Sequence, residues 1–93
     1  MEYKEILKLR KMLAAFRIPH EWERLYDGYH IGYPTLRHGV CSVIEHEYSY
    51  GGKDDKLEIS GLLTPKEQTM DTVCGGLTAE EVFHRIMQDY GKQ

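Results

Sequence analysis

Residues 21–33, with the sequence Glu-Trp-Glu-Arg-Leu-Tyr-Asp-Gly-Tyr-His-Ile-Gly-Tyr, decide the fold of this chain. Two runs typical of β-strands flank the pair Asp27-Gly28. This pair favours a two-residue type I′ turn, because both central residues of that turn need positive φ. The predicted hairpin pairs Tyr26 with Tyr29, Arg24 with Ile31 and Trp22 with Tyr33. Because side chains alternate along a strand, we expect all of these residues on one face of the hairpin.

Two further strands are expected after the hairpin. The first covers about residues 40–50, and alternation along it places three aromatic side chains on a common face, namely His46, Tyr48 and Tyr50. A glycine-rich turn at residues 51–55 leads to the second strand, residues 56–60. In this strand Leu57 and Ile59 are expected to face the core.

Helices are expected at both ends of the chain. Apolar residues recur at three- and four-residue steps from Tyr3 to Arg17, which predicts an amphipathic helix. The segment Thr78-Ala-Glu-Glu81 has the pattern of a capping box, and an apolar helical face follows it. A second such pattern, Thr64-Pro-Lys-Glu67, precedes a polar stretch, so we expect one short helical turn there and then a loop.

The order of these elements predicts one α+β domain over residues 1–93. Consecutive strands pair most simply as an antiparallel four-stranded meander sheet, with the N- and C-terminal helices packed on one face. A domain of this size buries a modest fraction of its surface, so oligomerisation would help to stabilise it. We therefore expect a homo-oligomer.

Composition excludes several classes of function. The formal net charge is −3, whereas a protein that neutralises many phosphates usually carries a basic face, so we expect no binding to long nucleic acid. No apolar run approaches the roughly 20 residues that a membrane-spanning helix needs, so we expect no membrane partner. The two cysteines, Cys41 and Cys74, lie far apart, and no targeting segment is evident. This pattern is typical of reduced thiols in a cytoplasmic protein.

Motifs for catalysis, metals and cofactors are missing from the sequence. None of the five histidines lies in a zinc-binding spacing, and Glu45, His46 and Glu47 point to alternating faces if they belong to a strand. No nucleophile elbow, phosphate-binding glycine loop or dinucleotide fingerprint is present. We expect no enzymatic activity, no catalytic residues, no metal and no cofactor.

The aromatic residues are the feature that points to binding. Tyrosine, tryptophan and arginine are enriched at binding hot spots, and an aromatic face beside an arginine can stack a base and pair a phosphate. The candidate ligand-binding residues are Trp22, Arg24, Tyr26, Tyr29, Tyr33, His46, Tyr48 and Tyr50. The alternative is purely structural, because strands favour aromatic residues in any case. Arg24 fits that alternative least well.

The chain resembles small accessory proteins encoded by phages and prophages of Gram-positive bacteria. The residues that carry the resemblance lie along nearly the whole chain, in segments 3–13, 18–20, 27–29, 46–51, 57–64 and 77–83. The resemblance implies no catalytic residue. Accessory proteins of this size often counter host defence, either by sequestering nucleotide immune signals or by blocking a defence effector.

These observations predict a non-enzymatic counter-defence protein in the cytoplasm of an infected bacterium. The first hypothesis is that it binds and sequesters a small nucleotide-like immune signal. The alternative is a protein-interaction inhibitor of a host defence effector, similar to an anti-CRISPR protein, that uses an aromatic surface patch. A structural or replication accessory role in the phage is a third reading.

Overall fold

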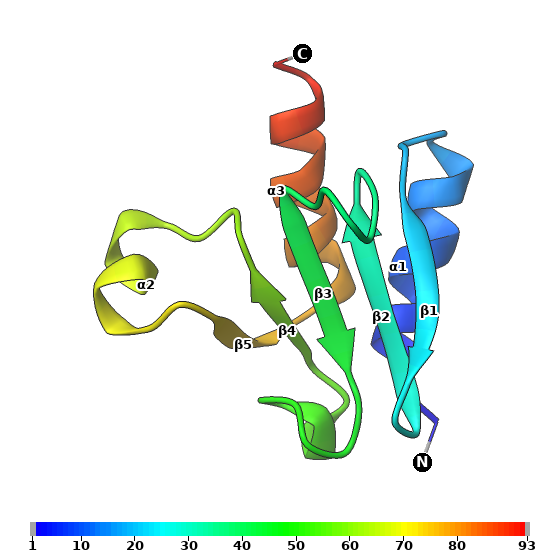
Figure 1. The fold of residues 1–93 in the computed structure, drawn as a ribbon, viewed down its shortest axis with the longest axis vertical. Helices are drawn as coiled ribbons and strands as arrows, with labels where there is room; N and C mark the ends of the chain where they lie inside the picture. Colours follow the sequence, from blue (N-terminus) through cyan, green and yellow to red (C-terminus); the bar gives the residue numbers. More distant parts are fainter. Residues whose placement is uncertain (1, 93) are drawn as a thin grey trace.

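A computed structural model describes residues 2–92, which form three α-helices and one antiparallel sheet of five strands in chain order (Figure 1). The α-helices are α1 (Lys4–Ala15), α2 (Pro65–Met70) and α3 (Ala79–Tyr90). The strands are β1 (Glu21–Leu25), β2 (Gly28–Tyr33), β3 (Cys41–Glu45), β4 (Leu57–Ser60) and β5 (Cys74–Leu77). A single turn of 3₁₀ helix, η1 (Gly52–Asp54), lies between β3 and β4.

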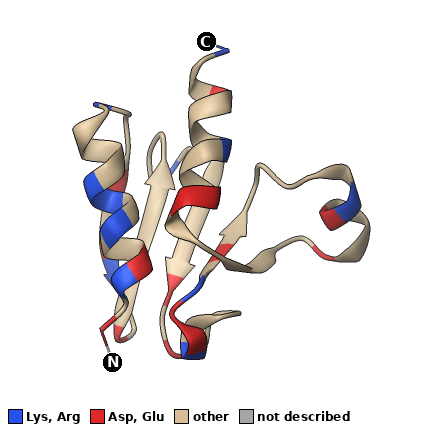
Figure 2. Cartoon of the chain, turned by 180° about the vertical axis from the view of Figure 1, so that it is seen from behind, with Lys and Arg blue, Asp and Glu red and all other residues tan. Residues whose placement is uncertain are grey.

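The molecule has two main layers. Helices α1 and α3 lie against the same face of the sheet and contact each other, as Figure 2 shows from behind. An ion pair between Lys8 and Glu80 joins the two helices at the surface. Helix α2 belongs to an excursion beside the sheet, between β4 and β5 (Figure 1). No described helix covers the opposite face of the sheet.

The core fills the space between the sheet and these two helices. Alternation along the strands turns one apolar row toward the helices, and the three- and four-residue steps of the helices turn a matching stripe toward the sheet. Residues that are fully buried between the two layers include Ile6, Leu9, Leu13, Ile31, Val43, Leu57, Ile59, Val82 and Ile86. The prediction that Leu57 and Ile59 face the core is therefore confirmed.

The helix ends follow local sequence signals. Both predicted capping boxes are present, because the Thr64 and Thr78 hydroxyls accept N–H groups of Glu67 and Glu81, whose carboxylates accept bonds in return. Helix α1 ends at Ala15, two residues before the predicted end at Arg17, which has a positive φ of 55°.

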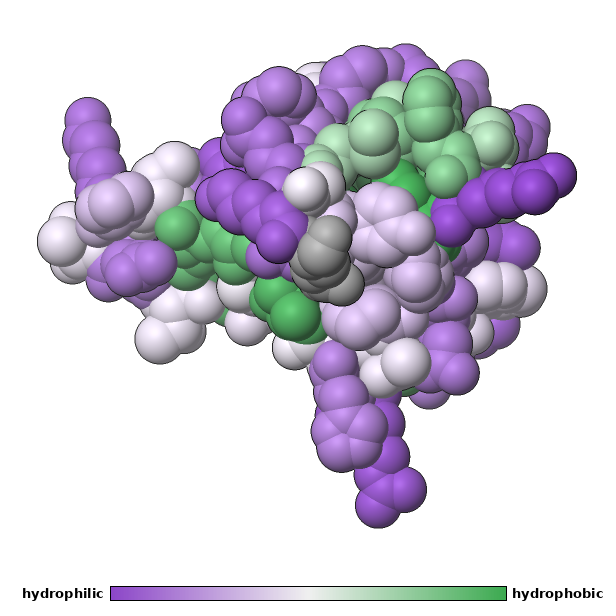
Figure 3. Space-filling view, turned by 90° about the horizontal axis from the view of Figure 1, so that it is seen from above, coloured by the Kyte–Doolittle hydropathy of each residue, from purple (hydrophilic) through white to green (hydrophobic). Residues whose placement is uncertain are grey.

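Just after the end of α1, Phe16 is 60% exposed and its ring centroid lies 5.2 Å from that of Phe83. Figure 3 shows hydrophobic residues at the surface on this end of the molecule.

The sheet has one strand more than the sequence predicts. Strand β5 pairs antiparallel with β4, and the register shifts between Leu57 and Ile59. Its sequence, Cys-Gly-Gly-Leu, lacks the alternation that identifies a strand, so the sequence predicts a loop here. Only Leu77 reaches the buried layer. The pairing with β4, not the local sequence, makes this segment a strand.

The hairpin has a different register from the predicted one. Its turn is Tyr26-Asp27, with φ of 53° at Tyr26, and the pairs are Leu25 with Gly28, Arg24 with Tyr29, and Trp22 with Ile31. A Cβ atom on Gly28 would lie 1.8 Å from the carbonyl oxygen of Glu45. Glycine is therefore needed inside β2, where it approaches β3, and the turn forms one residue earlier. The pattern of alternation is unchanged, except that Tyr26 belongs to the turn.

Strand β3 is shorter than predicted. It ends at Glu45, and a compact turn follows in which Ser49 bonds both the N–H and the carbonyl of His46. Gly51 continues the turn with a φ of 93°. His46, Tyr48 and Tyr50 therefore do not share a strand face, contrary to the prediction.

The described helices include none that is long and apolar enough to span a membrane.

Candidate binding surface

The structure distributes the predicted binding residues over separate places. Trp22, Arg24 and Tyr29 lie together on the helix-facing side of the hairpin, at the edge of the sheet beside α1. Tyr33 is fully buried, and its hydroxyl donates to Asp89 of α3 at 2.7 Å. The ring of Tyr33 is therefore part of the core and is closed to a ligand.

The remaining predicted residues belong to loops at the far end of the hairpin. Tyr26, His46 and Tyr48 form a ring cluster, with centroids 4.8 Å and 5.1 Å from Tyr26. Tyr50 takes no part in it, although it is 62% exposed. Tyr50 instead packs closely on Gly75, where an added Cβ would lie 2.4 Å from the Tyr50 Cβ and 2.9 Å from the Tyr50 carbonyl oxygen. The predicted continuous aromatic face is thus divided in two.

The surface at the edge of the sheet consists of two neighbouring aromatic rings, each with a guanidinium placed over it. The Arg10 guanidinium carbon lies 3.7 Å from the centroid of the Trp22 ring, and the Arg24 guanidinium carbon lies 4.9 Å from that of Tyr29. The two rings are tilted at 60° with centroids 5.8 Å apart. We call Arg10, Trp22, Arg24 and Tyr29 the cation–ring seam. Such contacts hold a guanidinium in a defined orientation.

The charges of β1 are separated by the alternation of the strand. Glu21 and Glu23 point to the open face, where they accept the Leu36 N–H at 2.9 Å and a His30 ring N–H at 2.8 Å. None of the ion pairs found within residues 2–92 involves Arg10 or Arg24. Both guanidiniums keep hydrogen-bond donors available at the surface.

A hollow of about 280 Å³ adjoins the seam. Its lining residues are Leu7, Arg10, Lys11, Ala14 and His20. The Nδ1 of His20 donates to the Ile18 carbonyl at 2.8 Å, which orients the imidazole ring. Blue segments on the outer side of α1 in Figure 2 show how basic this side of the molecule is. Sequence reasoning missed Arg10, because nothing in the sequence relates a position on α1 to the hairpin.

Sequence reasoning also missed two carboxyl groups, those of Glu45 and Asp55, which accept N–H groups in the first turn of α1. The N-cap residue Tyr3 makes no side-chain cap. Glu45 Oε1 accepts the Ile6 N–H at 3.1 Å, and Asp55 Oδ1 accepts the Glu5 N–H at 3.2 Å. Burial, followed by the neighbouring Asp55 carboxyl, raises the pKa of Glu45 to about 8. This pair caps a helix N-terminus from distant parts of the chain, which is a structural role.

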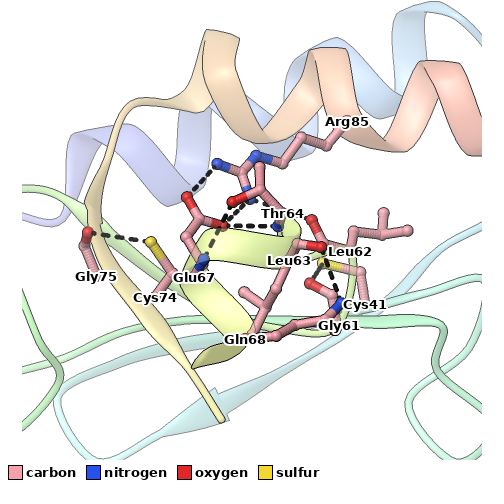
Figure 4. A network of polar contacts seen from close by, with 10 residues as sticks. All are labelled: Cys41, Gly61, Leu62, Leu63, Thr64, Glu67, Gln68, Cys74, Gly75 and Arg85. Carbon is pink, nitrogen blue, oxygen red and sulfur yellow. Dashed lines mark hydrogen bonds and ion pairs between the residues drawn. The ribbon is translucent and has the colours of Figure 1, made fainter. Parts of the chain in front are cut away.

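Another polar network ties the excursion of α2 to α3 (Figure 4). Arg85 donates two hydrogen bonds to Glu67, at 2.7 Å and 2.9 Å, and a third to the Leu62 carbonyl. This guanidinium lowers the pKa of Glu67 to about 2. The network of Arg85 and Glu67 satisfies its own charges and leaves none for a ligand.

Cys41 is buried, and burial raises the pKa of its thiol to about 12. The group is therefore an inert thiol.

The described residues do not gather a metal-ligand set: no group of three or more His, Cys, Asp or Glu side chains within residues 2–92 is placed to hold a metal ion. The cation–ring seam is therefore the strongest candidate for an anionic ligand, and the ring cluster of Tyr26, His46 and Tyr48 is a separate surface.

Comparisons with family models, curated proteins and solved structures give no match to this chain.

Proposed function

We propose that this protein is a non-enzymatic binding protein that sequesters a small, phosphate-bearing, nucleotide-like ligand at the cation–ring seam. The observation that carries the proposal is a pair of guanidiniums, Arg10 and Arg24, that rest on Trp22 and Tyr29 and have no carboxylate partner among the described residues. Guanidinium forks match the geometry of phosphate, and aromatic rings stack bases.

The exposure of the seam supports this role. Trp22 is 44% exposed, and Arg24 is exposed as well, so a ligand can reach both the ring and the guanidinium. The rings already orient the arginine side chains, which reduces the conformational entropy that binding would otherwise cost. Nearby, the hollow beside Arg10 gives room for a sugar or a second phosphate.

As part of the proposal, the protein acts as a counter-defence sponge in the cytoplasm of an infected bacterium. A sponge needs affinity for its ligand and no catalysis. Because β1 is an edge strand, two copies that pair along it would bring their seams together and enclose a small ligand more completely. We therefore propose a homo-oligomer.

The test is thermal shift and calorimetry of the full chain with cyclic AMP, cyclic di-AMP and ADP-ribose, and with adenosine as the phosphate-free control. A ligand at a hundred times its Kd should stabilise the fold by about 2.7 kcal/mol. Arg10→Ala and Arg24→Ala should each remove this stabilisation. Arg37→Ala is the matched control, because Arg37 is an exposed loop residue outside the seam.

Two outcomes would refute the proposal. The first is that none of the nucleotides stabilises the chain. The second is that Arg24→Ala lowers the free energy of unfolding by a core-like amount, on the order of 3 kcal/mol, since Arg24 would then be structural.

A further inference from the structure

A second surface lies at the end of the molecule where the hairpin turn meets the loop after β3. We call it the acidic pole, and its residues are Tyr3, Tyr26, Asp27, His46, Glu47 and Tyr48. We propose that the acidic pole binds a basic segment of a protein partner, with an arginine side chain of that segment placed against Tyr48 and between the carboxylates. This surface is separate from the cation–ring seam and does not depend on the function proposed for it.

Aromatic rings are presented at the pole in a fixed arrangement. Tyr26 is 68% exposed and Tyr48 is 70% exposed, and their rings meet edge to face with centroids 5.1 Å apart. The buried His46 ring lies 4.8 Å from Tyr26 and supports both tyrosines. Its Nδ1 accepts the Tyr48 N–H at 3.0 Å, which fixes the loop. Rings held this way lose little entropy when a partner binds.

Negative charge surrounds the rings. Asp27 accepts the Tyr3 hydroxyl with one carboxylate oxygen and the Glu47 N–H with the other, at 2.9 Å for the latter. The hydrogen bond from Tyr3 lowers the pKa of Asp27, so Asp27 is ionised at neutral pH. The charge of Glu47 raises the pKa of Tyr48. Asp27 and Glu47 therefore place carboxyl oxygen atoms beside the exposed rings.

A hollow between these groups has room for one long side chain. Its volume is about 670 Å³, and it is lined by Tyr3, Asp27, Glu47, Tyr48, Gly52 and Lys53. An arginine matches this lining, because its guanidinium stacks on tyrosine and pairs with carboxylates in the same plane. The lining has two carboxylates, those of Asp27 and Glu47, and one cation, Lys53, so its charge is complemented by positive charge from a partner. A basic protein segment supplies it and can also cover the exposed rings, as hot-spot tyrosines require.

The experiment titrates the ¹⁵N-labelled full chain with an acetylated, amidated peptide of alternating arginine and glycine, followed by amide NMR shifts. A peptide with citrulline in place of arginine is the uncharged control. The expected result is saturable shifts that centre on residues 26–27 and 46–53 and are absent with citrulline. Tyr48→Ala should raise the Kd at least tenfold, which corresponds to about 1.4 kcal/mol.

The matched control is Tyr50→Ala, since Tyr50 is an exposed tyrosine of the same loop that lies outside the ring cluster. It should change the Kd less than twofold, as should Arg24→Ala in the seam. Equal losses for Tyr48→Ala and Tyr50→Ala would overturn the proposal, as would shifts spread over unrelated acidic residues such as Glu80. If dilution without peptide shifts the pole amides, the occupant is a second copy of this chain, and the partner proposed here is wrong.

Discussion

Replacing the buried Glu45 with glutamine should stabilise this protein and remove much of its pH dependence near neutrality. Glu45 is fully buried at the end of β3, and its Oε1 accepts the Ile6 N–H. Its Oε2 is buried and has no hydrogen-bond partner among residues 2–92, and the carboxyl groups of Asp55 and Glu5 act on the Glu45 carboxyl group. Ionising Glu45 therefore places a charge where burial and two other carboxyl groups oppose it.

The magnitude follows from the pKa of Glu45, which rises from 4.5 to about 8 on folding. The folded state binds this proton more tightly, so the stabilisation is fully present below pH 4.5 and is lost as the pH rises through about 8. The full loss is about 5 kcal/mol, of which about 2 kcal/mol falls between pH 6 and pH 8. The lowered pKa of Asp55 acts in the opposite sense, but only below the ordinary pKa of an aspartate, 3.8.

Glutamine reproduces the protonated state of Glu45. Its amide oxygen can accept the Ile6 N–H, and its amide N–H can donate to Asp55. The expected gain for Glu45→Gln is about 3 kcal/mol at pH 7, with little change in stability between pH 6 and pH 8.

The assay is urea unfolding at pH 6, 7 and 8, followed by the fluorescence of Trp22. Glu2→Gln is the matched control, because Glu2 is exposed near the same helix end. Two results would contradict the reasoning: a wild-type stability that is flat across this range, or a Glu45→Gln variant that is less stable than wild type at pH 8.

The remaining predictions concern stability. Gly28→Ala should unfold the chain or destabilise it by about 3 kcal/mol or more, because its Cβ would lie 1.8 Å from the Glu45 carbonyl. In Gly76→Ala the added Cβ meets no atom within 4 Å, so this variant should cost only the strain of its positive φ, about 1 kcal/mol. Equal losses of stability for Gly28→Ala and Gly76→Ala in thermal unfolding would show that the close approach of Gly28 to Glu45 is unimportant. Arg85→Met should cost about 1–3 kcal/mol and speed amide exchange in α2, because Glu67 loses its partner. Since Arg85 lowers the pKa of Glu67 to about 2, this contribution should be present above pH 4.5 and lost as the pH falls toward 2, and a pH-independent cost would argue against the pair.

Much of the fold could be predicted from local sequence signals. The capping boxes at Thr64 and Thr78 hold because a hydroxyl and a carboxylate three residues apart satisfy the same helix end. The apolar steps of α1 and the alternation in β4 hold because each element has one face to bury. These patterns were enough to predict an α+β domain with an antiparallel sheet.

The candidate sites were predicted less completely. Alternation along the hairpin correctly grouped Trp22, Arg24 and Tyr29, but it gave no sign that Tyr33 would be buried against α3. Arg10, which completes the cation–ring seam, lies on a different element. Tyr26, His46 and Tyr48 meet only because β3 ends early and its loop folds back toward the hairpin turn.

The sequence by itself determined which segments become helices and most of the strands, because capping and periodicity depend on residues a few positions apart. Only the tertiary structure decided the hairpin register, the fifth strand and the composition of both surfaces. Gly28 meets the backbone of Glu45, β5 pairs with β4, and Arg10 covers Trp22. Each of these contacts joins segments that are distant in the chain, and its energy exists only after packing has brought them together.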